Sequence, residues 1–315
     1  MRVTSPFGGV VGRSGHPAQA GRRRPNTILR TWLVRVPPAG EIGFARWPPT
    51  SDRHPSSDRM TEPSYQPPHL AENAASASGN AAAFAPSADD VFARIAGRYD
   101  FLCDLFSLFA HRVWKARMAR VIAEAPGAVV LDVASGTGGI PFRVLDRLGK
   151  RADAPRIIAT DICPQMLDLA RRKIGERPGV DFALADAHSL EAFPTASVDV
   201  FSISFAMKIC DRHRVLDEAA RVLRPGGLFL CLEAARIPNE ALHWAYMKYV
   251  DWCMPMIARL ATGNDPGAYQ YLTRGIHGFP SQHEFAREIE VRGFRDVGYE
   301  NMTAGIVALH RGVKT

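Results

Sequence analysis

Short apolar runs alternate with amphipathic stretches along the chain after residue 88, and this alternation predicts strands that are each followed by a helix. Strands are expected at 128–133, 156–160, 180–185, 198–204 and 228–233. Helical spacing of apolar residues is expected at 139–148, 164–173 and 212–223, the last ended by Pro225-Gly226-Gly227. Strands that alternate with helices of about 10–15 residues predict an α/β fold with a doubly wound, mostly parallel sheet and helices on both faces.

The last quarter of the chain continues with helical spacing and closes on two more strands. Residues 239–261 have the length and spacing of an amphipathic helix or helix pair. A helix at 281–292 and strands at 295–301 and 303–310 follow. The expected sheet therefore has seven strands, and the expected folded domain is 89–315.

Residues 1–88 differ from the rest in composition. They hold 12 of the 23 prolines, ten Arg, no Lys and five acidic residues, and they keep no period long enough to bury a face. We expect a disordered N-terminal extension. Two interpretations stay open: a mitochondrial transit peptide, which is typically Arg-rich and poor in acids, or upstream sequence that precedes a true start at Met60.

Charge and cysteine content exclude several classes of protein. The net charge is +7 overall, but residues 1–88 alone carry +5, so the folded part is close to neutral and no nucleic-acid partner is expected. The five cysteines form no C-x-x-C pair and no Cys/His metal spacing, so neither a disulfide scaffold nor a metal site is expected. No run of about 18 apolar residues is present.

A glycine-rich turn follows the first predicted strand. Asp132-x-x-x-Gly136-Thr137-Gly138 leads from that strand into the next helix. Glycines let the chain turn tightly and let a ligand approach bare backbone amides. Asp161 ends the next strand, where a carboxylate accepts the two hydroxyls of a ribose. The sequence therefore predicts a nucleotide site at this edge of the sheet.

The residues of the turn exclude some classes of nucleotide ligand. A dinucleotide fingerprint needs Gly or Ala at position 141, which is Pro141 here, and no Lys-Ser/Thr pair follows as in a P-loop. The pattern D-x-x-x-G-x-G is instead that of class I S-adenosylmethionine (SAM) methyltransferases, in which the loop faces the methionine part of SAM. Asp186-Ala187, after the third strand, is placed to meet the adenine amino group.

The chain from about residue 91 to 315 resembles the ubiquinone/menaquinone biosynthesis C-methyltransferase family (UbiE/COQ5-like). The matching motifs are Val91-Phe92 through Asp100, His111-Arg112-x-Trp114-Lys115, Ser202–Phe205, Arg221–Gly227, Tyr269-x-Tyr271-Leu272 and Asn301–Gly312. This resemblance implies a Rossmann-like class I methyltransferase that uses SAM and acts on a polyprenyl quinol.

The resemblance also carries over site residues. In that family the SAM contacts fall on the residues that match Thr137, Asp161, Asp186, Ala187 and Ser204. Together with Asp132, Gly136 and Gly138 they make up the expected cofactor site. Residues at about 238–280 are expected to form a helical lid over the apolar acceptor.

Three departures from the family's usual pattern lie near the expected acceptor. Gly139 stands where the family usually has Asp, which removes a carboxylate that would meet the SAM amino group. Ala206-Met207-Lys208-Ile209 replaces Gly-Leu-Arg-Asn, so a point ammonium takes the place of a guanidinium. Cys103 stands where the family usually has Asn.

The expected chemistry needs a base or a cation near the acceptor. A ring carbon becomes nucleophilic when an adjacent hydroxyl ionises, and a phenol has a pKa near 10. The protein must take that proton or stabilise the phenolate. We expect Lys208 to be the cation and His310 to be the base or an orienting residue, with His111, Tyr269 and Tyr271 as further candidates.

Alternatives to a quinol stay open at this point. One alternative is a SAM-dependent methyltransferase of another acceptor, such as a phospholipid amine or a small-molecule hydroxyl. The other is a SAM-binding scaffold without turnover. The expected setting is cytoplasmic and peripheral to the inner membrane, or the mitochondrial matrix if the extension is a transit peptide. A homodimer or a biosynthetic complex is the expected assembly.

Overall fold

The fold is described from a computed structural model, which covers residues 92–93, 96–127, 129–149, 154–257 and 275–315. The chain divides after Pro63 into two compact units, and all the described residues belong to the second. The predicted N-terminal extension, Met60, and Tyr269 and Tyr271 lie outside the described residues, so those predictions stand as they were.

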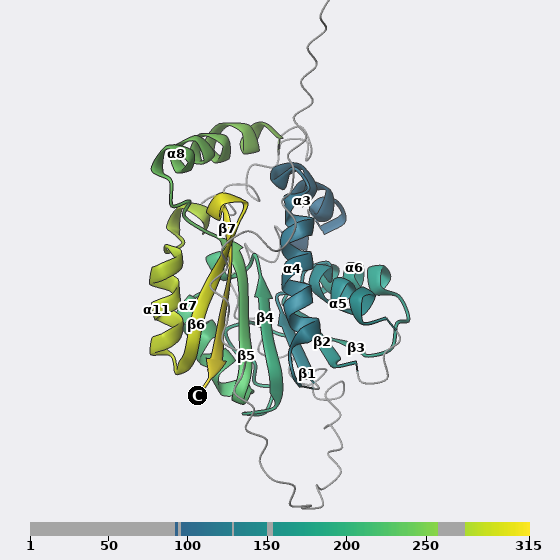
Figure 1. Cartoon of the computed structure of the whole chain (residues 1–315). Helices are drawn as coiled ribbons and strands as arrows, with labels where there is room; N and C mark the ends of the chain where they lie inside the picture. Colours follow the sequence, from purple (N-terminus) through teal and green to yellow (C-terminus); the bar gives the residue numbers. More distant parts are fainter. Residues whose placement is uncertain (1–91, 94–95, 128, 150–153, 258–274) are drawn as a thin grey trace, which may run out of the picture. The chain divides into compact units, whose positions relative to one another are not determined.

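A seven-stranded sheet organises the described part of the chain (Figure 1). Its order is β3-β2-β1-β4-β5-β7-β6; the first five strands run parallel, and β7 is antiparallel to both β5 and β6. This confirms the predicted doubly wound, mostly parallel α/β fold. The strands are β1 Val129–Val133, β2 Arg156–Asp161, β3 Val180–Leu184, β4 Val198–Ser204, β5 Leu223–Ala234, β6 Phe294–Met302 and β7 Val307–Lys314.

Helices cover both faces of this sheet (Figure 1). Apolar residues of α4 and α5 bury one face, and those of α7 and α11 bury the other. The central strands are buried on both sides, which is why their sequences are nearly continuous apolar runs. The helices are α3 Tyr99–Ser107, α4 Ala110–Glu124, α5 Gly139–Leu148, α6 Pro164–Ile174, α7 Arg212–Val222, α8 Glu240–Lys248 and α11 Gln282–Val291.

Local signals in the sequence account for several helix ends. α6 begins at Pro164, whose fixed φ suits the first helical turn. Ser281 Oγ accepts a hydrogen bond from the Glu284 amide, and the Glu284 carboxylate accepts one from the Ser281 amide, which is a capping box for α11. The N-cap of α7 is Asp211, whose carboxylate accepts from two backbone amides.

Two predicted strand boundaries were wrong. β5 begins at Leu223 rather than at 228, because Pro225-Gly226-Gly227 forms an irregularity within the strand instead of a turn before it. β7 begins at Val307 rather than at 303, because Thr303–Gly305 forms a 3-10 turn in which Ala304 has a φ of 57°. The left-handed backbone at this turn reverses the chain between β6 and β7.

The predicted lid is described only in part. α8 is followed by a π-helical turn at Tyr249–Cys253, which agrees with a helical segment from 239 onward. Residues 258–274 lie outside the described part. The lid at about 238–280 and the domain limits therefore stay predictions.

Gly138 connects the glycine turn to its helices and supplies a test of this packing. Its φ is +72°, and a Cβ here would lie 2.9 Å from the Ala170 Cβ and 3.3 Å from the Ala170 Cα. Gly138→Ala should therefore lower the free energy of unfolding by about 2–4 kcal/mol, from left-handed strain and a close contact together.

Gly136→Ala is the matched control, because Gly136 also has a positive φ, +57°, but a Cβ there meets no atom within 4 Å. It should cost only the backbone strain, about 1 kcal/mol. Urea unfolding of the SAM-free protein measures both values, and equal losses in the two variants would contradict this account.

Candidate functional site

Asp132, at the end of β1, lies beneath the glycine turn and not in a cavity. Its Oδ1 accepts a hydrogen bond from Ser202 Oγ at 2.6 Å, and its Oδ2 accepts one from Ser135 Oγ at 2.7 Å. Burial raises the pKa of this carboxyl to about 6. Asp132 therefore joins β1, β4 and the turn, and it acts on any ligand only through them.

Asp161 fixes the other side of the turn from the end of β2. Its Oδ2 accepts from the Gly136 amide at 2.7 Å and its Oδ1 from the Cys163 amide at 2.9 Å. Asp161 and Gly136 both line a cavity of about 100 Å³, which we call the first cavity. A carboxylate has about four lone-pair positions, so Asp161 keeps acceptor capacity for ligand hydroxyls.

Asp186, Ala187 and Ser204 line the same first cavity, as the sequence predicted for neighbouring strand ends. Asp186 Oδ1 accepts from the His188 amide at 2.9 Å and lies 2.7 Å from His188 Nδ1. The Asp211 amide donates to His188 Nε2 at 2.9 Å, so the ring proton is on Nδ1 and donates to Asp186. Sequence reasoning missed His188, although it directly follows the expected Asp186-Ala187 pair.

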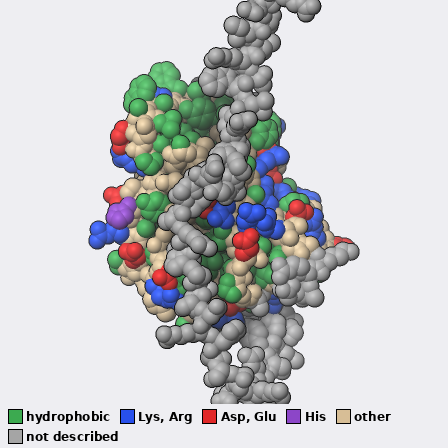
Figure 2. All heavy atoms as spheres, in the orientation of Figure 1, with side chains coloured by type: hydrophobic (Ala, Val, Ile, Leu, Met, Phe, Trp, Pro, Cys, Tyr) green, Lys and Arg blue, Asp and Glu red, His purple; other side chains and the backbone are tan. Residues whose placement is uncertain are grey.

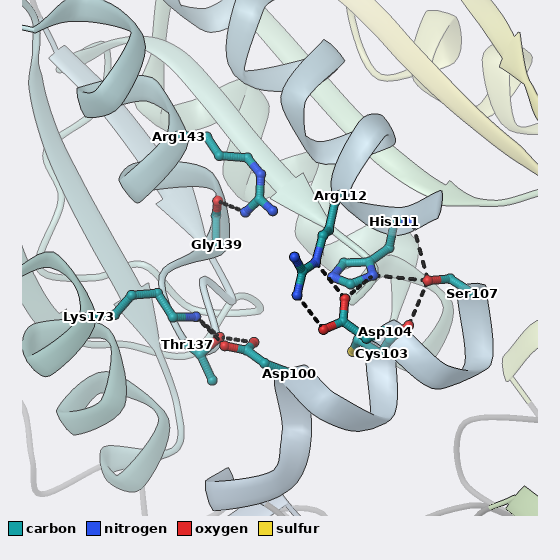
Figure 3. Close-up of polar contacts among 10 residues, drawn as sticks. All are labelled: Asp100, Cys103, Asp104, Ser107, His111, Arg112, Thr137, Gly139, Arg143 and Lys173. Carbon is teal, nitrogen blue, oxygen red and sulfur yellow. Dashed lines mark hydrogen bonds and ion pairs between the residues drawn. The ribbon is translucent and has the colours of Figure 1, made fainter. Parts of the chain in front are cut away.

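Thr137 and Gly138 lie beside the first cavity rather than in its lining. Thr137 Oγ1 donates to Asp100 Oδ1 at 2.6 Å and accepts from Lys173 Nζ at 2.8 Å, while Lys173 also pairs with Asp100 (Figure 3). This network joins α3, the glycine turn and α6. Asp100 has a lowered pKa because it accepts hydrogen bonds from Lys173 and Thr137, which outweigh its burial.

A larger second cavity, about 470 Å³, lies next to the first. Tyr99 and Phe205 line both cavities and so form their common wall. The second cavity is mainly apolar. Its lining includes Leu102, Phe106, Trp114, Tyr246, Tyr249, Met254, Ile276, Ile306 and Val307, together with the polar residues Ser107, His111, Lys115, Lys208 and Thr303.

Lys208 lines the second cavity, but its charge is already compensated. Its Nζ lies 3.0 Å from Glu233 Oε1 and also donates to the Phe205 carbonyl, and its backbone amide donates to Glu233 Oε2 at 3.2 Å. The Glu233 side chain is fully buried on β5. This pair fixes the segment after β4 and adds little net charge to the cavity.

His310 lines neither cavity. It lies on β7, 1% exposed, where Nε2 donates to the Gln282 carbonyl at 3.0 Å and the ring packs against Phe285 and Tyr299. Burial lowers its pKa to about 4. His310 thus belongs to the packing between β7 and α11 and, contrary to the expectation from the sequence, lies outside both cavities, where a base for the acceptor would be needed.

Two residues of α4 lie where the acceptor is expected: His111, which the sequence offered as a further candidate, and Lys115, which it did not. His111 and Lys115 both line the second cavity and lie one helical turn apart on α4. Lys115 Nζ lies 3.0 Å from the position that a Cβ on Gly139 would occupy, and 5.9 Å from the centroid of the Phe205 ring. Burial lowers the pKa of Lys115. The H-R-x-W-K motif was the available signal for both residues.

The first cavity has the groups that SAM requires. Asp161 offers carboxylate oxygens for hydroxyls, Asp186 offers one for an amine, and the open space at Gly136 leaves a backbone amide edge without a Cβ. The first cavity also adjoins the second, as methyl transfer between two ligands requires. The residues present therefore fit SAM.

Comparison with known proteins agrees with this geometry. The model of the ubiE/COQ5 methyltransferase family matches residues 82–314. A ubiquinone/menaquinone biosynthesis C-methyltransferase UbiE from Brucella anthropi is 40% identical over 72% of this chain and 86% of its own length. A mitochondrial 2-methoxy-6-polyprenyl-1,4-benzoquinol methylase from Drosophila melanogaster is 37% identical over 71% of this chain and 79% of its own length.

Solved structures agree on the fold. A SAM-dependent methyltransferase from Thermotoga maritima has a TM-score of 0.51 at 17% identity and covers 72% of this chain and 99% of its own. The fold and the family match together establish SAM as the methyl donor and make this protein an enzyme. The chain belongs to the ubiE/COQ5 methyltransferase family of SAM-dependent methyltransferases.

Proposed function

We propose that this enzyme transfers a methyl group from SAM to a ring carbon of a polyprenyl quinol in ubiquinone or menaquinone biosynthesis. The observation that carries the proposal is the large apolar cavity that shares Tyr99 and Phe205 with the SAM cavity. An apolar acceptor placed there has its ring next to the methyl donor. The names of the relatives in Brucella and Drosophila support the same substrate class.

The chain's own residues supply alignment and exclusion of water. SAM supplies a methyl group on a positively charged sulfur. Asp161 and Asp186 would hold the nucleoside, and the wall of Tyr99 and Phe205 would set the distance between donor and acceptor. The apolar lining excludes water from the reacting atoms and strengthens electrostatic interactions there.

We propose a supporting role for Lys208, because Glu233 compensates its charge. Its ammonium holds the Phe205 carbonyl, and Phe205 is part of the wall between the cavities. Lys208 would then keep the wall in place and present a polar edge to the acceptor. The sequence analysis expected Lys208 to stabilise a phenolate directly with an unpaired charge. The proposed role is instead to hold the wall between the cavities.

We further propose that the enzyme takes its acceptor from a membrane surface. Within the described residues no helix is long and apolar enough to cross a membrane. Large apolar side chains are nevertheless exposed on α3, α4 and the α8 region, and Figure 2 shows hydrophobic side chains gathered over α8. They are Phe101, Leu108, Phe109, Val113, Leu242, Trp244, Trp252 and Met256.

These exposed residues come from elements that also line the second cavity. A tail that enters from a bilayer would therefore reach the cavity without crossing water. The inner membrane is the proposed location, on the matrix side if the N-terminal extension is a transit peptide. The homodimer or biosynthetic complex stays a prediction.

Transfer of a labelled methyl group from SAM by the purified full chain tests the substrate class. The acceptors are a reduced demethylubiquinol analogue, a demethylmenaquinol analogue and phosphatidylethanolamine vesicles. We expect label on a quinol ring carbon. Label on the lipid amine alone would show that the departures at 206–209 redirect the family chemistry, and no label on any acceptor would contradict the proposal.

Asp161→Asn should weaken SAM binding about 10- to 100-fold. The change removes the charge and sets an amide NH₂ against one of the two backbone amides that the carboxylate accepts, and hydrogen bonds to a charged group contribute about 1.5–3 kcal/mol. Isothermal titration with SAM measures the affinity. Asp168→Asn is the control, because Asp168 is exposed on α6 and pairs only with Arg171 among the described residues; equal affinities would contradict the assignment.

Lys208→Met should lower the free energy of unfolding by about 3 kcal/mol, because it leaves the buried Glu233 without its cation. The double variant Lys208→Met/Glu233→Gln should recover most of this loss, since no buried charge then stays unpaired. Urea unfolding measures each variant. Equal stability of the single and double variants would show that the pair does not behave as a buried ion pair.

The double variant Trp244→Ser/Trp252→Ser should bind vesicles of phosphatidylglycerol and phosphatidylethanolamine at least tenfold more weakly. Both side chains are exposed in the protein, and each would contribute about 1.5–3 kcal/mol or more when it inserts into the bilayer. Co-sedimentation measures the partition. Val291→Ser is the control, since Val291 is 83% exposed on α11. An unchanged partition of the double variant would show that the α8 region does not contribute to membrane binding.

A further inference from the structure

One face of α4 presents a basic nitrogen and a cation to the second cavity. His111 and Lys115 are four residues apart, so their side chains lie on the same face of the helix. Both line the cavity in which the acceptor ring is proposed to bind. Among the described lysines of this cavity, Lys208 is paired with Glu233, whereas no carboxylate of a described residue forms an ion pair with Lys115.

The hydrogen bonds around His111 fix its tautomer. Ser107 Oγ donates its only proton to the Cys103 carbonyl at 2.6 Å (Figure 3). The same oxygen lies 2.9 Å from His111 Nδ1 and can only accept there, so Nδ1 carries the ring proton. Nε2 therefore keeps its lone pair, and no described residue is hydrogen-bonded to it.

A carboxylate stands on the protonated side of the ring. Asp104 Oδ1 lies 3.7 Å from His111 Nδ1 (Figure 3). Arg112 donates to both Asp104 oxygens at 2.6 Å, and these bonds hold the pKa of Asp104 below its usual value. Asp104 stays ionised and would stabilise an imidazolium at His111, which is how a carboxylate supports a histidine base.

The charges around His111 keep it neutral until an acceptor binds. Its pKa is lowered to about 4, first by burial and then by the charge of Lys115. Arg143 on α5 and Arg112 on α4 lower it further, and Asp104 on α3 opposes them. A negative oxygen next to Lys115 would cancel the main repulsive charge, so the basicity of His111 would rise as the phenolate forms.

We propose that His111 is the general base of the reaction and that Lys115 stabilises the acceptor oxygen that His111 deprotonates. This inference rests on the proposed function, because it requires an acceptor hydroxyl in the second cavity. Ser107 and Asp104 act as positioning residues, because they fix the orientation and the tautomer of the His111 ring.

The proton and electron balance is complete within this scheme. The quinol O–H bond breaks and the proton moves to His111 Nε2. An electron pair of the ring carbon then forms the bond to the methyl carbon, while the pair of the S–CH₃ bond goes to sulfur. The methylated ring then tautomerises, so that the C–H proton of the methylated carbon ends on the ring oxygen, and the imidazolium gives the first proton to solvent at product release. One proton is therefore released per turnover.

His111→Ala tests the proposal in the full chain, with a quinol analogue under anaerobic, reducing conditions. At pH 7.5 we expect kcat to fall about 10²- to 10⁴-fold, the usual contribution of a general base, with SAM affinity unchanged. The rate of the variant should then rise tenfold per pH unit toward the hydroxyl's own pKa, near 10, whereas the wild type stays flat. His283→Ala, an exposed residue of α11, should keep the wild-type rate and profile.

Ser107→Ala keeps the proposal testable if the histidine variant does not fold. Without the Ser107 hydroxyl, the ring proton of His111 is no longer held on Nδ1, so Nε2 is less often available as the base. We expect kcat to fall about tenfold at unchanged KM, and Ser107→Thr should restore it. A wild-type rate and pH profile in His111→Ala would overturn the inference. An inactive wild type would instead overturn the proposed quinol substrate, and SAM affinity lost in His111→Ala, with kcat kept at saturating SAM, would place His111 in the SAM site.

Discussion

The buried carboxylate of Asp132 is the constraint on which the site depends. It is 1% exposed at the centre of the sheet, where an unpaired charge would cost several kcal/mol, and it is tolerated because Ser202 and Ser135 both donate to it. These bonds tie β1 to β4 and to the glycine turn. Once the turn is fixed there, the Gly136 amide meets Asp161, and two neighbouring strand ends converge on one cavity.

The second cavity follows from the same construction. Phe205 comes directly after β4, with a left-handed φ of 58°, and Tyr99 begins α3. Because the Asp100–Thr137–Lys173 network holds α3 against the glycine turn, Tyr99 of α3 lines both cavities together with Phe205. One set of contacts thus positions both the donor site and the acceptor site. A change in the glycine turn would therefore alter the geometry of both cavities.

The sequence predicted what depends on order along the chain. The sheet, the glycine turn, Asp161 and Asp186 follow from strand ends of a parallel sheet lying at one edge. It did not predict contacts between distant segments. Glu233 neutralises Lys208 from β5, and the packing of His310 against α11 places that residue outside both cavities. The late start of β7 also depends on a local left-handed turn at Ala304, a residue type that rarely adopts it.

Two departures from the family's usual pattern, at positions 139 and 208, both change the charges around the acceptor cavity. The family usually has a carboxylate at position 139, and a Cβ there would stand 3.0 Å from Lys115 Nζ, so the glycine leaves this position beside the ammonium without a carboxylate. At position 208, a lysine held by Glu233 replaces a guanidinium. Among the described residues, the lysine of the acceptor cavity that forms no ion pair therefore lies on α4, on the same helix face as His111, rather than after β4. This shift connects the two substitutions and makes α4 the element that recognises an acidic hydroxyl.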